Sequence, residues 1–296
     1  MKEFQIDRLI RAIGEKDNPS ALGLDTRLEF VPPSFARSYA AEGGPAVIRA
    51  FNFALLDALK DIVPCVKVQA AYYELLGPEG MVCMADTLAE ARRLGYVAIL
   101  DAKRGDIGAT AKAYGGAYLA EDAPCPADFL TVNPWFGTDG VQPFLDDCAA
   151  TGRGIFALVK TSNPSSAEFQ DVKTDDGEPL FVRVGDRVSA WGEALIGAEG
   201  YSSVGAVVGA TWPEQGAMLR RRLPHTFFLL PGYGAQGASA DDLAGSFDAK
   251  GRGAVVNASR SLICAHKKAG TEDFVSAARD EALRMRDALR EALRGR

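Results

Sequence analysis

The sequence contains few histidines and no Cys-x-x-Cys motif, and these absences exclude several kinds of functional site. The 296 residues include two histidines, His225 and His266, and neither ends an apolar segment typical of a strand. A histidine-rich metal site is therefore excluded, and a Ser-His-Asp triad would need one of these two residues. The five cysteines are odd in number, widely spaced and without a Cys-x-x-Cys pair, which indicates reduced thiols.

The sequence also lacks a long apolar run and an excess of positive charge. No run approaches the roughly 20 residues that a helix needs to cross a bilayer, and the first residues, Met-Lys-Glu-Phe-Gln-Ile-Asp, lack the apolar core of a secretion signal. The formal net charge is -6, and the Lys and Arg residues are scattered along the chain, unlike the basic surface of a nucleic-acid-binding protein. We therefore expect a cytoplasmic protein with no membrane or nucleic-acid partner.

Short apolar segments typical of buried strands alternate with segments that carry apolar residues at helical spacing. Hydrophobic residues make up 47% of the chain and charged residues 24%, which is ordinary for a globular protein with a large core. The eight predicted strands are residues 21–25, 65–69, 96–103, 129–133, 154–160, 203–209, 227–232 and 253–259. The predicted helices include residues 44–60, 81–94, 108–120, 138–150 and 213–222, flanked by helices at about 4–13 and 272–293.

Strands that alternate with helices form parallel βαβ units, and eight such units predict a (β/α)8 TIM barrel. The length suits one barrel, which is typically about 250 residues, and no linker divides the chain, so we expect one domain over residues 1–296. A doubly wound sheet is the alternative. The barrel is favoured because polar residues such as Asp25, Asn133 and Lys160 lie at or near the C-terminal ends of predicted strands, where barrel active sites are built.

The first group of candidate functional residues is charged and belongs to the second and third predicted strands. Residues two apart in a strand share a face, so Asp101 and Lys103 are expected to point the same way, while Asp106 and Thr110 share one face of a following helix. Taken singly, Lys67 could be an edge residue with an exposed ammonium group, and Asp106 a helix N-cap. Charges on neighbouring strand ends are costly to bury unless they are paired. The combination therefore favours a catalytic site.

The second group follows the seventh and eighth predicted strands. Pro-Gly-Tyr-Gly-Ala-Gln-Gly at 231–237 matches a Gly-x-Gly-x-x-Gly pattern, but a dinucleotide fold would place an acidic residue at the end of the next strand, which ends in Asn-Ala-Ser-Arg at 257–260. In a barrel, the loops after strands seven and eight commonly bind phosphate through backbone amides, and Arg260 adds a guanidinium group suited to phosphate. The pattern favours phosphate binding over a purely structural glycine turn.

The third group is Thr-Ser-Asn-Pro at 161–164, which opens the longest irregular segment, residues 161–179. Ser162 and Asn163 could hydrogen-bond a polar ligand or shape a turn before Pro164. Segments of this length inside compact domains are usually functional or mobile. A lid over the mouth of the barrel and a solvated insertion both remain open.

In order and spacing, these motifs resemble the orotidine 5'-phosphate decarboxylase family across nearly the whole chain. Asp-x-Lys-x-x-Asp alone is shared with sugar-phosphate decarboxylases and aldolases of the same superfamily, whereas the combination is much more specific. The length of the chain is similar to the longer bacterial branch of the family. The resemblance rests on Asp-x-Lys-Arg-Gly-Asp-Ile-x-x-Thr at 101–110, Lys67, Thr-Ser-Asn-Pro at 161–164, Pro-Gly-Tyr-Gly-Ala-Gln-Gly at 231–237 and Ser-Arg at 259–260.

The resemblance implies a homodimeric enzyme, without cofactor or metal, that converts orotidine 5'-phosphate to UMP and carbon dioxide in pyrimidine synthesis. Lys67, Asp101 and Lys103 would act within one subunit, and Asp106 and Thr110 would reach into the neighbouring site. The implied substrate-binding residues are Asp25 at the ribose hydroxyls, Ser162 at the pyrimidine edge, Gln236 and Arg260 at the phosphate, and in addition Pro231 and Ser259.

Loss of carbon dioxide from C6 of the pyrimidine leaves a localised carbanion, so a cation at that carbon is the direct physical requirement. Lys103 is the predicted cation, first as a stabilising charge and then as the proton donor. A rival is a Mg²⁺-dependent sugar-phosphate decarboxylase or aldolase, but Lys67 stands where that enzyme needs a second carboxylate beside Asp101. A non-catalytic phosphate-binding barrel is the other alternative. It would keep Arg260 but would have no need for Lys67, Asp101, Lys103 and Asp106 together.

Overall fold

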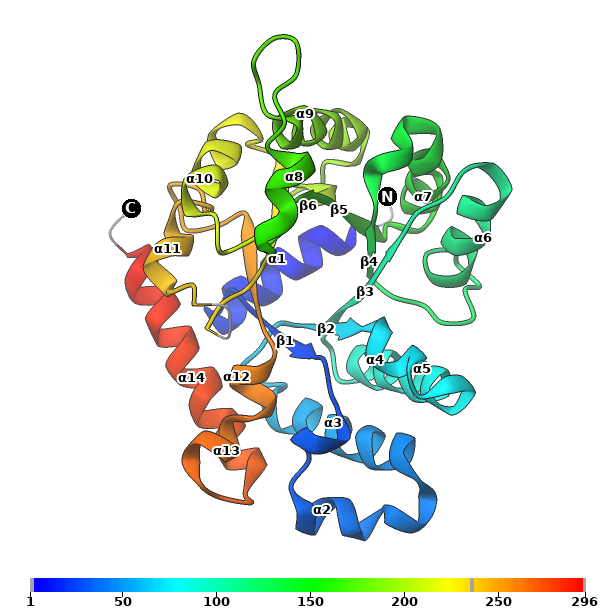
Figure 1. Cartoon of the computed structure of the whole chain (residues 1–296), viewed down its shortest axis with the longest axis vertical. Helices are drawn as coiled ribbons and strands as arrows, with labels where there is room; N and C mark the ends of the chain where they lie inside the picture. Colours follow the sequence, from blue (N-terminus) through cyan, green and yellow to red (C-terminus); the bar gives the residue numbers. More distant parts are fainter. Residues whose placement is uncertain (1–2, 235–236, 295–296) are drawn as a thin grey trace.

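The computed structural model describes residues 3–234 and 237–294, and within these residues eight parallel strands close into a barrel surrounded by helices (Figure 1). Each strand pairs with its neighbours in chain order, and the last strand pairs with the first. This is a TIM barrel, so the doubly wound alternative is wrong. The strands are β1 Ser20–Leu24, β2 Cys65–Gln69, β3 Val97–Arg104, β4 Phe129–Val132, β5 Gly154–Lys160, β6 Ser202–Val208, β7 Thr226–Pro231 and β8 Ala254–Ala258.

All eight predicted strands are confirmed, and no strand end is displaced by more than one residue. Their composition explains why the apolar pattern is easy to read. The strands of a parallel barrel are covered on both faces, so they appear as nearly continuous apolar runs. β1, β4, β6 and β8 are buried along their whole length.

Helices connect the strands and flank the barrel at both ends of the chain. The α-helices are α1 Gln5–Lys16, α2 Pro33–Ser38, α3 Gly44–Leu59, α4 Ala70–Glu74, α5 Gly77–Arg93, α6 Gly108–Tyr118, α7 Gly137–Thr151, α8 Ala167–Gln170, α9 Leu180–Gly192, α10 Pro213–Arg222, α11 Ala240–Ala244, α12 Arg260–Ile263, α13 Ala265–Ala269 and α14 Phe274–Leu293. The 3-10 helices are η1 Leu28–Phe30, η2 Ala40–Glu42, η3 Pro134–Phe136, η4 Pro164–Ser166 and η5 Glu193–Leu195.

The seven predicted helices correspond to α1, α3, α5, α6, α7, α10 and α14. The helix α9 is not among them, because its valines and glycines have low helix propensity. Its buried residues include Phe181, Val182 and Val188, which lie on one face only once the chain is helical. Tertiary packing therefore decides its structure.

The segment 161–179 is more regular than predicted. It contains η4 and α8, and an isolated antiparallel bridge joins Lys173 to Pro179. The prediction of a wholly irregular segment is therefore wrong. The short elements are built from polar and small residues, whose spacing gives no apolar period to read.

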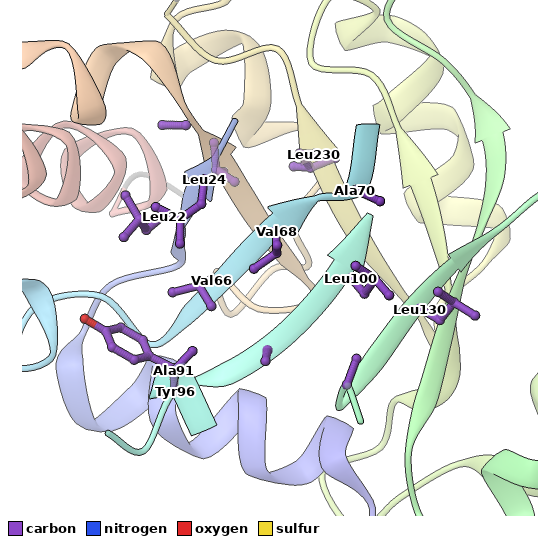
Figure 2. Packing of buried hydrophobic residues seen from close by; sticks show 14 of the residues in the cluster. Leu22, Leu24, Val66, Val68, Ala70, Ala91, Tyr96, Leu100, Leu130 and Leu230 are labelled. Carbon is purple, nitrogen blue, oxygen red and sulfur yellow. The ribbon is translucent and has the colours of Figure 1, made fainter. Parts of the chain in front are cut away.

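Side chains alternate between the interior of the barrel and the layer beneath the helices. Because successive strand residues face opposite sides, Ala21 and Cys65 join the interior cluster, while Leu22 and Val66 join the outer one. Figure 2 shows part of the outer cluster, including Leu22, Leu24, Val66 and Val68. The alternation fixes which residue near each strand end faces the barrel axis.

The helix α1 closes the N-terminal end of the barrel. Ile6, Leu9 and Ile10 belong to the same buried cluster as the first inward residues of the strands. The carboxylate of Asp7 is buried and accepts hydrogen bonds from the backbone N–H groups of Ala198, at 3.0 Å, and Glu199, at 2.8 Å. These bonds tie α1 to the loop before β6.

None of the helices in the described part of the chain combines the length and the apolar character that a membrane span requires.

We predict that Asp7→Ala lowers the free energy of unfolding by about 3 kcal/mol, because hydrogen bonds to a charged acceptor are lost and two donors are left near the bottom of the barrel. Urea denaturation followed by circular dichroism measures this loss. Glu15→Ala is the matched control, since Glu15 lies exposed on the same helix and is expected to change stability by no more than about 0.5 kcal/mol. Equal effects of the two substitutions would contradict the assigned role of Asp7.

Candidate active site

A cavity of about 570 Å³ opens at the C-terminal end of the barrel. This volume lies in the range of small-molecule sites, and the position is the one at which TIM-barrel enzymes build their active sites. Residues of β2, β3, β7 and β8, the residue Asp25 just after β1, and residues of the segment after β5 are among those that line it. The predicted site residues among them are Asp25, Lys67, Asp101, Lys103, Ser162, Pro231, Ser259 and Arg260.

Strand register brings the charged residues of β1, β2 and β3 together. Lys67 pairs with Gly23 on one side and with Ile99 on the other. Asp25 and Asp101 each lie two residues beyond those partners, so all three charged side chains face inward at the top of the barrel. A glycine is required at position 23, because a Cβ there would lie 2.0 Å from the Ser259 Oγ atom.

The three charged side chains form one chain of ion pairs with Lys103. The Lys67 Nζ atom lies 2.9 Å from Asp101 Oδ2 and 3.4 Å from Asp25 Oδ1. The Lys103 Nζ atom lies 2.6 Å from the other oxygen, Asp101 Oδ1. Lys67 and Asp101 are buried, whereas the Lys103 side chain is 46% exposed. Lys103 is therefore the cation of this group whose charge a ligand can meet directly.

Two uncharged side chains complete the hydrogen bonding of Asp101. Thr131 Oγ1 donates to Asp101 Oδ1 at 3.0 Å, and Gln69 Nε2 donates to Asp101 Oδ2 at 3.0 Å. A buried carboxylate needs such donors to offset its lost hydration. Both oxygens of Asp101 are held by one ammonium and one neutral donor each, which fixes the carboxylate plane.

The backbone at Lys103 departs from regular strand geometry. Its φ of 50° lies in the left-handed region, which is unfavourable for a residue with a Cβ, and the β3–β4 register shifts between Leu100 and Arg104. The Lys103 N–H donates to Thr131 Oγ1 at 2.8 Å, and this bond supports the conformation. Asp101 and Lys103 are expected from strand alternation to point the same way; their side chains do meet, but with this local distortion of the strand.

The environment keeps both buried groups charged. Burial by itself would raise the pKa of Asp101, but the ammonium groups of Lys67 and Lys103 hold this pKa well below its usual range. Burial by itself would lower the pKa of Lys67, but the carboxylates of Asp101 and Asp25 raise this pKa above its ordinary value. The array is therefore an alternation of fixed charges at neutral pH.

Asp106 and Thr110 do not line this cavity among the described residues. Thr110 is exposed on α6, and Asp106 lies before the helix, which begins at Gly108. The prediction that both residues sit on one helical face is therefore wrong for Asp106. Asp106 Oδ1 accepts the N–H of Ile107, so the side chain does not cap the helix at its second or third residue.

The expected phosphate and pyrimidine residues lie at the cavity wall. Pro231 ends β7, Ser259 follows β8, and Arg260 begins α12. Ser162 lines the cavity from the segment after β5. Gln236 lies outside the described residues.

Among the polar cavity residues that were not predicted from the sequence, three lie inside strands that read as apolar. They are Gln69, Thr131 and Asn257. Asn257 is buried, its Nδ2 atom donates to Ser259 Oγ at 3.3 Å, and its Oδ1 atom has no hydrogen-bond partner among the described residues. Alternation along a strand gives the direction that these side chains face only once the register of the strands is known.

The arrangement of the carboxylates does not favour a divalent cation. Asp25 and Asp101 are the carboxylates that face each other here, and the Lys67 ammonium group already lies between them. No cluster of three His, Cys, Asp or Glu side chains suited to a metal occurs within residues 3–234 and 237–294.

The fold and the site together define a TIM-barrel enzyme with a chain of ion pairs at the C-terminal face of the barrel. The model of the Orotidine 5'-phosphate decarboxylase / HUMPS family matches residues 47–272. A curated orotidine 5'-phosphate decarboxylase of Rhodopirellula baltica is 43% identical over 292 residues, which cover 96% of this chain and 95% of that protein. The chain belongs to the orotidine 5'-phosphate decarboxylase family.

Other relatives agree over nearly the full length. An orotidine 5'-phosphate decarboxylase of Clostridium novyi is 40% identical over 286 residues, covering 96% of this chain and 98% of its own. The structure of Leishmania donovani OMP decarboxylase has a TM-score of 0.75 and 28% identity, covering 97% of this chain and 98% of that chain. A crystal structure from Streptomyces avermitilis has a TM-score of 0.81 and 33% identity, covering 99% and 97%.

We predict that Asp101→Asn destabilises the protein by about 3 kcal/mol at neutral pH. The substitution leaves the buried Lys67 ammonium group with Asp25, the more distant carboxylate, as its charged partner. The lowered pKa of Asp101 means that its stabilisation is present above the unfolded pKa of about 3.9 and is lost as the pH falls through the folded value. The raised pKa of Lys67 means that its stabilisation is present below about 10.4 and is lost as the pH rises through the folded value.

Urea denaturation between pH 2 and pH 9 checks this prediction. The difference in unfolding free energy between the native sequence and Asp101→Asn is expected to be constant from about pH 5 to pH 9 and to shrink below about pH 4. A difference that stays constant down to pH 2 would contradict the lowered pKa.

Proposed function

We propose that this chain catalyses the cofactor-free decarboxylation of orotidine 5'-phosphate to UMP and carbon dioxide, a step of pyrimidine biosynthesis, with residues 1–296 as one barrel domain. Family membership supports the reaction. The observation that carries it is the Lys67–Asp101–Lys103 array at the cavity. Lys67 and Asp101 are buried, whereas Lys103 is partly exposed and carries a positive charge. Loss of carbon dioxide creates a localised negative charge, which such a cation stabilises.

Substrate contacts follow from the chemistry of the cavity wall. Arg260 and Gln236 bind the phosphate, with Pro231 and Ser259 beside them. Arg260 lines the cavity and has a fork-shaped cation suited to phosphate oxygens. Asp25 follows β1, the strand that pairs with β8, and lines the same cavity. It accepts hydrogen bonds from the ribose hydroxyls.

Ser162 hydrogen-bonds the polar edge of the pyrimidine. It lines the cavity beside Thr161 and Asn163, so neutral donors and acceptors face the same space. A neutral hydroxyl suits an uncharged ring edge, because it neither repels nor over-binds the negative charge that develops elsewhere on the ring.

Lys103 stabilises the carbanion and then protonates it. The bond between C6 and the carboxylate carbon breaks, and the electron pair stays on C6. The Lys103 ammonium group transfers a proton to C6 and is reprotonated from water. Because its Nζ atom is held by Asp101 at 2.6 Å, the cation is already oriented before the charge develops, which is the condition for electrostatic preorganisation.

One ion pair does not account for the whole acceleration. Opposite unit charges 4 Å apart attract by about 4 kcal/mol at an effective dielectric constant of about 20, whereas enzymes lower barriers by about 8 to 23 kcal/mol. The remainder is assigned to preorganised groups and to phosphate binding that is expressed in the transition state. Asp101 holds both lysines in place. Its repulsion of the substrate carboxylate is a secondary contribution.

A homodimer completes each site with Asp106 and Thr110 of the neighbour. Both residues lie outside the cavity of their own chain. Exposed apolar side chains lie near them, including Ile107 and Trp135, which is 70% exposed, and Phe136 lies against Gly105 and Gly140. Such an apolar surface is typical of a protein interface. We place the dimer in the cytoplasm, in agreement with five free cysteines.

Ultraviolet absorbance of the purified protein with orotidine 5'-phosphate in EDTA tests the reaction, with unphosphorylated orotidine alongside. Conversion to UMP is expected in EDTA and is expected to be far slower without the phosphate, because remote binding energy is lost. Failure in EDTA, with Mg²⁺-dependent turnover of a sugar phosphate, would replace this proposal with the rival enzyme. Binding of orotidine 5'-phosphate without turnover would indicate a non-catalytic barrel.

Mixing two inactive variants tests the shared site. Lys103→Ala and Asp106→Asn homodimers are each expected to lose nearly all turnover, and their mixture is expected to recover some, because a hybrid dimer holds one intact site. Circular dichroism checks that each variant is folded, and native mass spectrometry checks subunit exchange. Exchange without recovery would contradict a site that uses residues of both subunits.

A further inference from the structure

Lys160 is a fully buried lysine that does not line the cavity. It ends β5, and its Nζ atom donates to Asp171 Oδ1 at 2.6 Å and to Ser166 Oγ at 3.3 Å. Two aromatic rings enclose the ammonium group, with centroids at 4.6 Å for Trp212 and 5.5 Å for Phe181. The array at β1, β2 and β3 makes no use of this charge.

Both hydrogen-bonding partners of Lys160 belong to the segment 161–179. A buried ammonium group is costly unless a counter-charge and hydrogen bonds compensate it. Asp171 provides that charge only while the segment is folded back over β5. The ion pair therefore ties the segment to the barrel at Asp171, directly after α8. Figure 1 shows where α8 lies on the barrel.

The first residue of the segment is held by three further hydrogen bonds. The Thr161 N–H donates to Gln170 Oε1 at 2.9 Å, and Gln170 Nε2 donates to Thr161 Oγ1 at 2.8 Å. Trp212 Nε1 donates to the Thr161 carbonyl oxygen at 2.8 Å. Gln170 is the neighbour of Asp171, so the ion pair and these bonds stabilise one conformation.

The backbone of Ser162 is seated directly against the end of β6. Thr211 Oγ1 donates to the Ser162 carbonyl oxygen at 3.0 Å. A Cβ at Gly209 would lie 2.7 Å from the Ser162 Cα atom, so this close approach requires glycine. The position of the Ser162 side chain thus depends on contacts made by its neighbours.

We propose that Lys160 and Asp171 form a positioning pair that holds the segment 161–171 against the barrel and keeps Ser162 at the cavity wall. Lys160 acts through Ser162 and does not touch the substrate. The role in substrate binding rests on the proposed function, whereas the role in holding the segment does not.

Steady-state kinetics of Lys160→Met, Ser162→Ala and the double variant test the coupling. Methionine has nearly the same apolar length as the lysine side chain. The Asp171 carboxylate is partly exposed and can be hydrated by solvent, so the variant is expected to fold. Lys160→Met is expected to raise KM for orotidine 5'-phosphate about tenfold, the loss of roughly one hydrogen bond, with a smaller change in kcat. Ser162→Ala is expected to cost much less in the Lys160→Met background than alone.

Limited trypsin digestion tests the segment independently of turnover. Lys173 is exposed within the segment, so cleavage there reports its release from the barrel. Lys160→Met is expected to speed this cleavage about tenfold, consistent with the loss of an anchoring interaction. Asp171→Asn is expected to speed it further, because it leaves the ammonium group without its counter-charge.

Arg220→Met is the matched control. Arg220 is also a buried cation beside aromatic rings, but it bonds backbone carbonyls of Gly253, Leu223 and Thr226, away from the cavity. It is expected to lower stability without changing KM or the cleavage rate at Lys173 under folded conditions.

The outcomes separate the two proposals. Unchanged cleavage at Lys173 in both Lys160→Met and Asp171→Asn would overturn the positioning pair, and so would fully additive effects of Lys160→Met and Ser162→Ala on kcat/KM. A native chain without turnover would overturn the proposed function alone, and the digestion would still decide whether Lys160 and Asp171 hold the segment.

Discussion

The site depends on one buried carboxylate that two ammonium groups share. Asp101 binds Lys67 through one oxygen and Lys103 through the other, so movement of either lysine removes one of the two ion pairs of this buried carboxylate. This constraint orients the exposed member toward the cavity before any ligand arrives. The neighbouring opposite charges also shift the pKa of Lys67 and the pKa of Asp101 in the direction that favours the charged form.

The barrel makes that contact possible. Its closed parallel sheet places the ends of β1, β2 and β3 side by side, and alternation along each strand turns Asp25, Lys67 and Asp101 inward. Below them, apolar side chains fill the axis and α1 covers the far end. The low-dielectric interior strengthens the ion pairs above it, so the core contributes to the electrostatics as well as to the fold.

The strands and the charged motifs could be predicted from the sequence because both depend on local pattern. Asn257 and Thr131 could not, since a polar residue within an apolar strand gives no sign of the direction it faces until the register is known. The anchoring of the segment 161–179 was equally hidden, because Lys160 and Asp171 become partners only when the chain turns back. Asp106 precedes α6 rather than lying on it, since the end of a strand and the start of a helix are decided by backbone geometry that side-chain periodicity does not encode.

The closure of the barrel by α1 has a kinetic consequence. Since the bottom is sealed and the interior is filled by side chains, substrate enters and both products leave through the face that the segment 161–171 borders. Under the proposed function, the nucleotide would be held by its phosphate and ribose, whereas carbon dioxide is small and uncharged. The gas would then leave first, and UMP that stays bound would compete with the next substrate molecule.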